Sequence, residues 1–336
     1  MRISKWLMMA LALMLCAALA AGCADKEGKN DKNNGADDGT NVSEQDNQGE
    51  DGSEQPQSDD DQDRNQNEDD TDVVNGYNGL IASGASSAEM LQYITDNYTK
   101  VKPETLTTML VELERSQHDQ SLVLEERYYT EAGVQEKLMD LYAAADFTMP
   151  SLDQIEDETL KKLLQDTEAA GYKPETAEGS FFPVIDYERY REFQSHVTAD
   201  MKAYIDIMAL ESNKPAVKDA GLIIKWSEVV ERARSMEKFL KDYPDSVKQE
   251  DMQGLFNGYK YISFYGIDNA PLFSYTDKTI VPEVKEAYLQ ALEGGTKDSA
   301  YLQTMQEFLD VVERNGGKQT EEVQTFQEKT TSGLLD

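Results

Sequence analysis

Glu211 and Ser212, at the end of a predicted helix, are the residues whose types and spacing best fit chemistry. They belong to Ala209-Leu210-Glu211-Ser212-Asn213-Lys214-Pro215, and Ala220-Gly221-Leu222-Ile223 follows a short way along the chain. A glutamic acid that burial keeps protonated near neutral pH can donate its proton to a leaving group. The sequence therefore offers one candidate for general acid catalysis.

The two segments resemble the Glu-Ser and Ala-x-Gly-Leu segments of lytic transglycosylases, which cut peptidoglycan with one glutamic acid at a helix end. The resemblance implies that Glu211 would be the general acid. This chain departs from the family pattern, because the two segments lie closer together, Ile223-Ile224 replaces Met-Gln, and the downstream aromatic motifs are absent. We therefore predict that the protein is not an enzyme and that Glu211 is an exposed residue at a helix end. Wall-lytic catalysis through Glu211 is the least favoured alternative.

The sequence predicts no metal site and no cofactor. His118 and His196 are its only histidines, and no His-Glu-x-x-His helix occurs. Each histidine is expected at a polar, solvated junction beside a helix. Nucleophilic serine motifs, a catalytic cysteine and phosphate-binding glycine loops are also missing from the sequence.

Aromatic residues crowd into one segment near the carboxyl end and are the candidate ligand-binding residues. They are Tyr259, Tyr261, Phe264, Tyr265, Phe273 and Tyr275, with Trp226 as a further candidate. Gly258, Gly266 and Pro271 interrupt the segment. Aromatic faces in a glycine-bearing loop favour sugars or peptides, because they offer a large area with few rotatable bonds. The alternative is that these side chains pack a core between helix pairs.

The first residues of the chain predict export. Arg2 and Lys5 precede an apolar run from Trp6 to Leu19, and small residues lead to Cys23. Leu19-Ala20-Ala21-Gly22-Cys23 resembles the lipobox of bacterial lipoproteins. The resemblance implies a signal peptide over residues 1–22 and acyl chains, such as palmitate, on Cys23.

This lipoprotein assignment places the protein at the cell membrane, lipid-anchored on its extracytoplasmic face. The only other cysteine, Cys16, lies inside the leader, so no disulfide is expected. Several acyl chains on one residue would hold the protein durably, whereas a single chain binds only marginally. In overall style the chain is similar to lipoproteins of spore-forming Gram-positive bacteria.

A tether is expected over residues 23–72. Residues 24–72 hold eighteen acids against four bases and almost no hydrophobic side chains. Such a composition predicts disorder, and a flexible coil of this length would span about 35–42 Å. Asp59-Asp60-Asp61-Gln62-Asp63 has ligand-like alternation, but Arg64 stands where a calcium-binding EF-hand loop needs glycine. The formal net charge of the chain is −33, which disfavours binding to nucleic acid.

The apolar spacing beyond the tether is mostly helical, so we predict an all-α fold of antiparallel helix pairs with at most a few short strands. Residues 73–171 and 181–336 are expected as two helical subdomains, divided by the proline-bearing stretch 172–180. Ser86-Ser87 is expected to cap one helix. A long helix is expected from about Asp119 to Ala145. Three segments look least helical: 181–187, 222–225 and 259–275.

The leading functional hypothesis is a non-enzymatic binding or scaffolding module whose partner is an envelope protein or the cell wall. It depends on the predicted lipid anchor, the long spacer and the absence of catalytic motifs. The alternative is a small-ligand receptor for a sugar or peptide. Such receptors commonly have two α/β lobes, and this sequence lacks the alternation of strands and helices that these lobes require.

Overall fold

The computed structural model describes residues 60–335. The predicted signal peptide, Cys23 and the predicted tether as far as residue 59 lie outside the described residues. The α-helices are α2 (Asp60–Ser83), α3 (Ser87–Asn97), α4 (Pro103–Thr130), α5 (Val134–Ala144), α6 (Glu158–Ala169), α7 (Tyr187–Tyr190), α8 (Ala199–Asn213), α9 (Trp226–Asp242), α10 (Gln249–Tyr265), α11 (Pro282–Leu292), α12 (Ala300–Arg314) and α13 (Glu321–Thr331). Short 3₁₀ helices are η1 (Tyr98–Lys100), η2 (Leu152–Gln154) and η3 (Arg191–Phe193).

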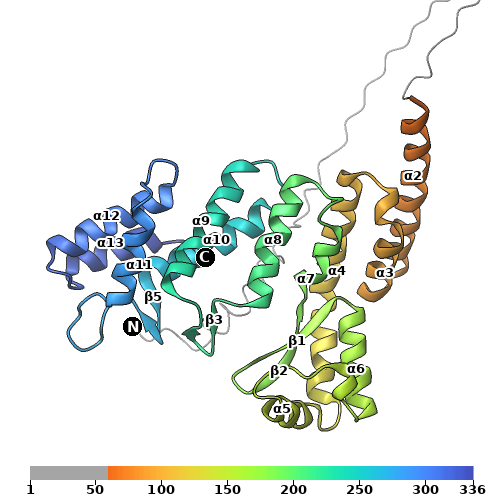
Figure 1. Ribbon diagram of the computed structural model, residues 1–336, viewed down its shortest axis with the longest axis horizontal. Coiled ribbons are helices and arrows are strands. Elements are labelled where there is room, and N and C mark those ends of the chain that lie inside the picture. Colours follow the sequence, from red (N-terminus) through yellow and green to blue (C-terminus); the bar gives the residue numbers. More distant parts are fainter. Residues whose placement is uncertain (1–59, 336) are drawn as a thin grey trace, which may run out of the picture.

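The predicted mostly helical class is confirmed. The strands of the described chain form three two-stranded antiparallel hairpins. They are β1 (Tyr172–Ala177) with β2 (Ser180–Ile185), β3 (Val217–Lys218) with β4 (Gly221–Leu222), and β5 (Gly266–Ile267) with β6 (Ala270–Pro271). Figure 1 shows the helices side by side across the molecule, from α2 and α3 at one end to α12 and α13 at the other, with the hairpins along the lower edge.

Helix α2 corrects the expected end of the tether. The helix begins at Asp60, so residues 60–72 are helical where disorder was predicted. Val73 and Tyr77 are buried one turn apart, and the Tyr77 hydroxyl donates to the backbone oxygen of Met109 at 2.8 Å. The packing of Val73 and Tyr77 therefore stabilises a helix that extends toward the amino terminus into the acidic residues 60–72.

Helix α4 is longer than the sequence suggested. It runs without interruption through His118, which was expected at a junction between helices. Glu114 and Gln117 are buried on its inner face, so this polar segment belongs to the interior. The chain breaks instead just before α5, at Gly133, whose φ of 73° favours glycine. The helix expected from Asp119 to Ala145 is therefore divided between α4 and α5.

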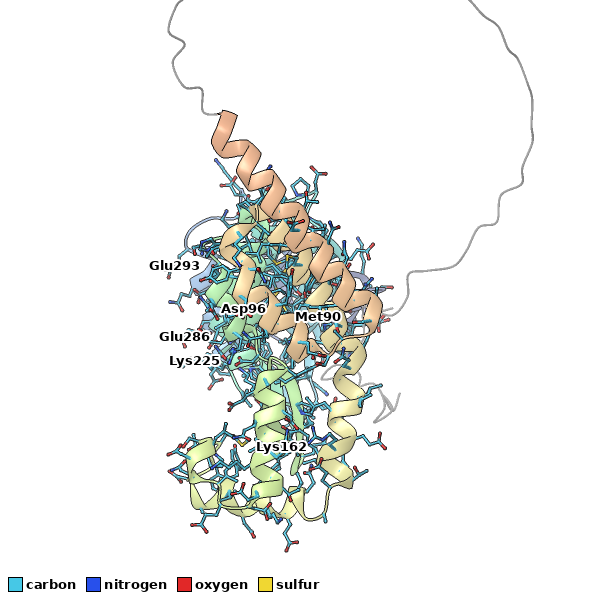
Figure 2. The ribbon with its side chains drawn as sticks, turned by 90° about the vertical axis from the view of Figure 1, so that its right-hand side faces the viewer. Met90, Asp96, Lys162, Lys225, Glu286 and Glu293 are labelled. Atoms are coloured by element: carbon cyan, nitrogen blue, oxygen red, sulfur yellow. The ribbon has the colours of Figure 1, made fainter. Side chains whose placement is uncertain are left out.

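Two hydrophobic clusters form the core. The larger one draws on helices from α2 to α13, with residues from both sides of the predicted divide at 172–180. The smaller one joins the end of α4 to α5, α6 and the β1–β2 hairpin through Tyr128, Val134, Leu138, Ile155, Leu160, Leu163, Leu164 and Phe181. Figure 2 shows α6, marked by Lys162, below α3, the helix that carries both Met90 and Asp96.

The segments expected to be least helical have three outcomes. Residues 180–185 form β2, so the segment 181–187 is non-helical over most of its length, and only Tyr187 belongs to a helix, α7. Of the segment 222–225, only Leu222 lies in a strand, β4. The segment 259–275 was read wrongly over its first part, because residues up to Tyr265 belong to α10. Gly258 lies inside that helix and gave a misleading loop signal.

The predicted cap at the start of α3 is confirmed and gives a stability prediction. Ser86 Oγ accepts a hydrogen bond from the Glu89 backbone N–H at 3.3 Å, and the Glu89 carboxylate accepts one from the Ser86 N–H at 2.8 Å. Ser86→Ala is expected to lower the free energy of unfolding by about 0.5–2 kcal/mol in urea titration. The control Ser235→Ala, at an exposed serine within α9, is expected to stay within about 0.5 kcal/mol of wild type. Equal effects of the two variants would contradict this reading.

A buried ion pair joins α4 to the start of α10. Lys248 Nζ lies 2.6 Å from the Glu114 carboxylate, and both side chains are almost fully buried. The hydroxyls of Tyr187 and Tyr204 donate to the same carboxylate, the latter at 2.6 Å. Asp251 completes the cluster 2.9 Å from Lys248 Nζ. The network therefore ties α7 and α8 to α4 and to the start of α10.

The pKa of Glu114 carries a pH prediction. Burial alone would raise this pKa, but the Lys248 charge and three hydrogen bonds lower it below the usual range. The stabilisation is therefore complete above the unfolded pKa of about 4.3 and is lost as pH falls through the lower, folded pKa. We expect the stability difference between wild type and Glu114→Gln to shrink as urea titrations move from pH 6 into that acidic window. Glu126→Gln, at an exposed site on the same helix, should show no such convergence.

Candidate functional site

Glu211 is buried, which corrects the expectation of an exposed helix end. It lies in the last turn of α8 with 5% of its surface exposed. The Tyr259 hydroxyl lies 2.8 Å from both carboxylate oxygens, and Arg232 Nη1 lies 3.0 Å from one of them. Three helices, α8, α9 and α10, thus meet at one carboxylate.

Arg232 holds the other side of this network. Its Nη1 also donates to the Lys214 backbone oxygen at 2.8 Å, and its Nη2 donates to Glu228 at 2.6 Å. Its Nε is buried and has no hydrogen-bond partner in the described part of the chain. The guanidinium therefore fixes the end of α8 and the loop after it against α9.

Burial and charge pairing have opposite effects on the pKa values of Glu211 and Arg232. Burial raises the pKa of Glu211, while the Arg232 charge and the Tyr259 hydrogen bond act to lower it. Burial disfavours the charged form of Arg232, but the Glu211 charge outweighs it and raises the guanidinium pKa. A general acid must reach its substrate, whereas both oxygens of Glu211 are already engaged by neighbouring side chains. The geometry favours a structural role for Glu211.

A groove lies between α8 and α9, above this network. It encloses about 330 Å³, and Glu211 and Arg232 are among the residues that line it. Its apolar lining comes from Ala203, Ile207, Leu210, Met236, Phe239 and Tyr243. Leu210 keeps 44% of its surface exposed. The groove thus combines a mostly apolar lining with two polar side chains that are already paired with each other.

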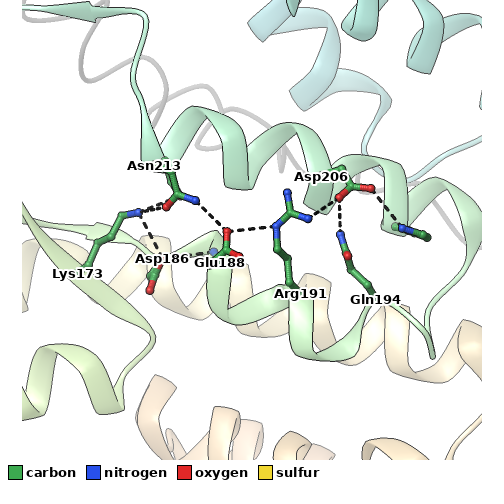
Figure 3. Close-up of polar contacts among 9 residues, drawn as sticks. Lys173, Asp186, Glu188, Arg191, Gln194, Asp206 and Asn213 are labelled. Carbon is green, nitrogen blue, oxygen red and sulfur yellow. Dashed lines mark hydrogen bonds and ion pairs between the residues drawn. The ribbon is translucent and has the colours of Figure 1, made fainter.

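A chain of polar contacts holds one wall of the groove in place, as Figure 3 shows. Asp206, which lines the groove, accepts hydrogen bonds from Arg191 and Gln194, each at 2.8 Å. Farther along, Asn213 donates to Glu188 at 2.8 Å and accepts from Lys173 at 2.6 Å. These contacts bind α8 to α7, η3 and β1, so the groove wall is braced along its length.

The structure divides the seven aromatic candidates. Tyr259, Phe264 and Phe273 are buried in the larger cluster and offer no surface to a ligand, so these three predictions are corrected. Trp226 is half-buried at the start of α9 and packs against the same cluster. Tyr261 is half-buried, and Tyr265 and Tyr275 are exposed. Helical spacing within α10 causes the division, because it places alternate aromatics on opposite faces.

The two histidines lie in different surroundings. His118 is half-buried within α4, where burial lowers its pKa although the charge of Glu114 acts to raise it. His196 stacks edge-on against Tyr98, with ring centroids 4.9 Å apart. Among residues 60–335, no group of three or more His, Cys, Asp or Glu side chains is placed to hold a metal ion. Within the same range, no helix has the length and apolarity needed to cross a membrane.

Comparisons with protein-family models, curated proteins and solved structures give no match to this chain. The functional argument therefore depends on the site itself.

The sequence analysis missed the partners of Glu211 and the whole Glu114–Lys248 network. Arg232 lies one helical turn after Glu228, which is a visible signal for that pair alone. Nothing local to Glu114 or Lys248 indicates that they meet, because more than a hundred residues separate them.

Proposed function

We propose that this protein is an extracytoplasmic lipoprotein, anchored through Cys23, that acts as a non-enzymatic binding or scaffolding module for an envelope partner. The leader, the lipobox-like Cys23 and the acidic stretch after it support the location. The internal pairing of Glu211 supports a binding role over catalysis.

The α8–α9 groove is the observation that carries the binding role. Its size falls at the lower end of the range of about 300–1,000 Å³ found for ligand sites. Residues 24–59 contain almost no apolar side chains, so this acidic segment is a poor occupant of an apolar groove. A hydrophobic segment of an envelope protein fits better, because burying its side chains against the exposed Leu210 removes apolar surface from water.

Site-specific photo-crosslinking in living cells tests this proposal. A photoreactive amino acid at Leu210 in the full-length protein should yield one discrete crosslinked envelope protein. Leu289, on α11, is the matched control, because it is the same residue type and is 46% exposed against 44% for Leu210. Crosslinks of equal yield and identity at both positions, or none at Leu210, would count against the groove.

A small-ligand receptor is the second candidate, since the groove volume would also accommodate a peptide fragment. A ligand that binds only the folded state raises its apparent stability by mass action. Thermal unfolding with sugars and short peptides separates the two candidates. A small ligand that stabilises the wild type but not Ile207→Asp, a variant of the groove wall, would favour the receptor.

A further inference from the structure

The surface tyrosines left over from the aromatic segment form a group around the β5–β6 hairpin. Tyr261 and Tyr265 occupy successive turns of α10, with stacked rings whose centroids are 5.1 Å apart. The Tyr275 hydroxyl donates to the Asp268 backbone oxygen at 2.7 Å, which ties its ring to the hairpin turn. Tyr265 is 44% exposed and Tyr275 is 66% exposed. We call Tyr261, Tyr265, Tyr275 and Asp268 the tyrosine platform.

Gly266 makes this arrangement possible. It follows Tyr265 directly and has a φ of 82°. A Cβ at this position would lie 3.0 Å from the Leu272 nitrogen and 3.1 Å from the Ala270 oxygen. Only glycine therefore fits this tight reversal, which returns the chain toward the end of α10. The raised pKa of Tyr261, caused by burial and then by Tyr265 and Asp268, agrees with this proximity.

The neighbouring hairpin holds the platform in position. The Asn269 backbone N–H donates to the Ala220 oxygen at 3.4 Å, and its side-chain amide donates to the Asp219 oxygen at the same distance. The β5–β6 turn is thus fixed against the β3–β4 turn. Lys278 Nζ lies 5.8 Å from the centre of the Tyr275 ring and limits its movement. Large aromatic surfaces are held in place at the surface before any ligand arrives.

The chemistry of the platform selects the ligand class. Tyrosine rings offer flat apolar faces, which suit the C–H face of a sugar ring. Asp268 is exposed at the hairpin turn, and its carboxylate can accept hydrogen bonds from two adjacent hydroxyls. An extended peptide would need a free strand edge or an enclosed groove for its backbone, and the platform offers exposed tyrosine rings instead. The chain's charge of −33 disfavours anionic polymers.

We infer that the tyrosine platform binds a neutral or amino-bearing glycan. This inference rests on the proposed function and adds to it, because it names the wall glycan as a second ligand of the anchored protein. It uses a different surface from the α8–α9 groove. Purified glycan is sufficient to test it, so its outcome does not depend on whether a protein partner is captured at Leu210.

Co-sedimentation of the full-length protein with insoluble glycan is the test. The probes are chitin, chitosan and peptidoglycan sacculi stripped of anionic polymers, each assayed in low salt and in about 1 M NaCl. Binding should persist in high salt, because ring stacking is screened far less than surface charge. The double variant Tyr265→Ala/Tyr275→Ala should bind about tenfold more weakly, which corresponds to about 1.4 kcal/mol.

Tyr129→Ala is the matched control, since Tyr129 is 52% exposed but lies on α4, away from the platform. Thermal unfolding checks that all the variants are folded. We expect that they are, because the substituted residues lie at the surface. Equal sedimentation of the double variant and wild type would overturn the inference. Binding that is lost in high salt, or binding of soluble stem peptides in preference to glycan, would also overturn it.

Discussion

Replacing Lys248 with methionine is expected to lower the free energy of unfolding by about 3–5 kcal/mol at neutral pH. The substitution removes the cation that lies 2.6 Å from Glu114 and leaves that carboxylate buried without a counter-charge. The hydroxyls of Tyr187 and Tyr204 remain as donors but cannot replace a full positive charge. Urea unfolding followed by circular dichroism measures the difference.

A second substitution separates a lost charge pair from lost packing. Glu114→Gln/Lys248→Met removes both charges and keeps an amide oxygen for the two tyrosine hydroxyls. Because an uncharged replacement of a buried pair is often close to neutral, the double variant should recover most of the stability lost in Lys248→Met. A double variant no more stable than Lys248→Met would contradict the ion-pair account, as would a loss below about 1 kcal/mol in the single variant.

Replacing Arg232 with methionine should have a similar effect, about 3–5 kcal/mol at pH 7, with a distinctive dependence on pH. Burial already holds the pKa of Glu211 above its ordinary value in the wild type, and removing the guanidinium, whose charge lowers this pKa, raises it further. Below the wild-type folded pKa the carboxyl is protonated in both proteins, so the penalty is small. The penalty grows as pH rises from that value toward the higher folded pKa of the variant, because folded wild type then ionises Glu211 and the folded variant does not.

Urea titrations of Arg232→Met at pH 4 and pH 7 measure this growth. Arg234→Met is the control, because Arg234 lies on the same helix and is exposed. A penalty that is equal at both pH values would show that Arg232 acts through packing alone. Release of muropeptides by the purified wild type, abolished in Glu211→Gln, would instead restore the catalytic reading.

Local signals in the sequence predicted much of the fold. Ser86-Ser87 marked the start of α3, and the helical spacing of apolar residues predicted the mostly helical fold. Helix α2 was missed because the acidic composition before Val73 outweighed a short apolar pattern. Propensity and composition are local quantities, whereas the packing of Tyr77 against α4 is not.

The candidate site was only partly visible for the same reason. Glu211 was found through its neighbours in sequence, but its burial depends on Arg232 and Tyr259 from two other helices. The aromatic segment was found by composition, and its division into core and surface required the helical register of α10. The four-residue spacing of Tyr261 and Tyr265 is the signal that could have indicated a shared helix face.

The groove and the tyrosine platform both require the same location of the protein. Each can meet an envelope protein or wall glycan only if the protein lies outside the cytoplasmic membrane. The lipid on Cys23 is therefore the claim on which both proposals depend, and this residue lies outside the described part of the chain.

Intact mass spectrometry of the protein extracted from membranes of its native host tests that claim most directly. We predict a mature chain that begins at Cys23 and carries the added mass of two or three acyl chains. A Cys23→Ala variant should keep its leader and lack that added mass. An unmodified Cys23 in the mature wild-type protein, or an intact precursor recovered from the cytosol, would contradict the account.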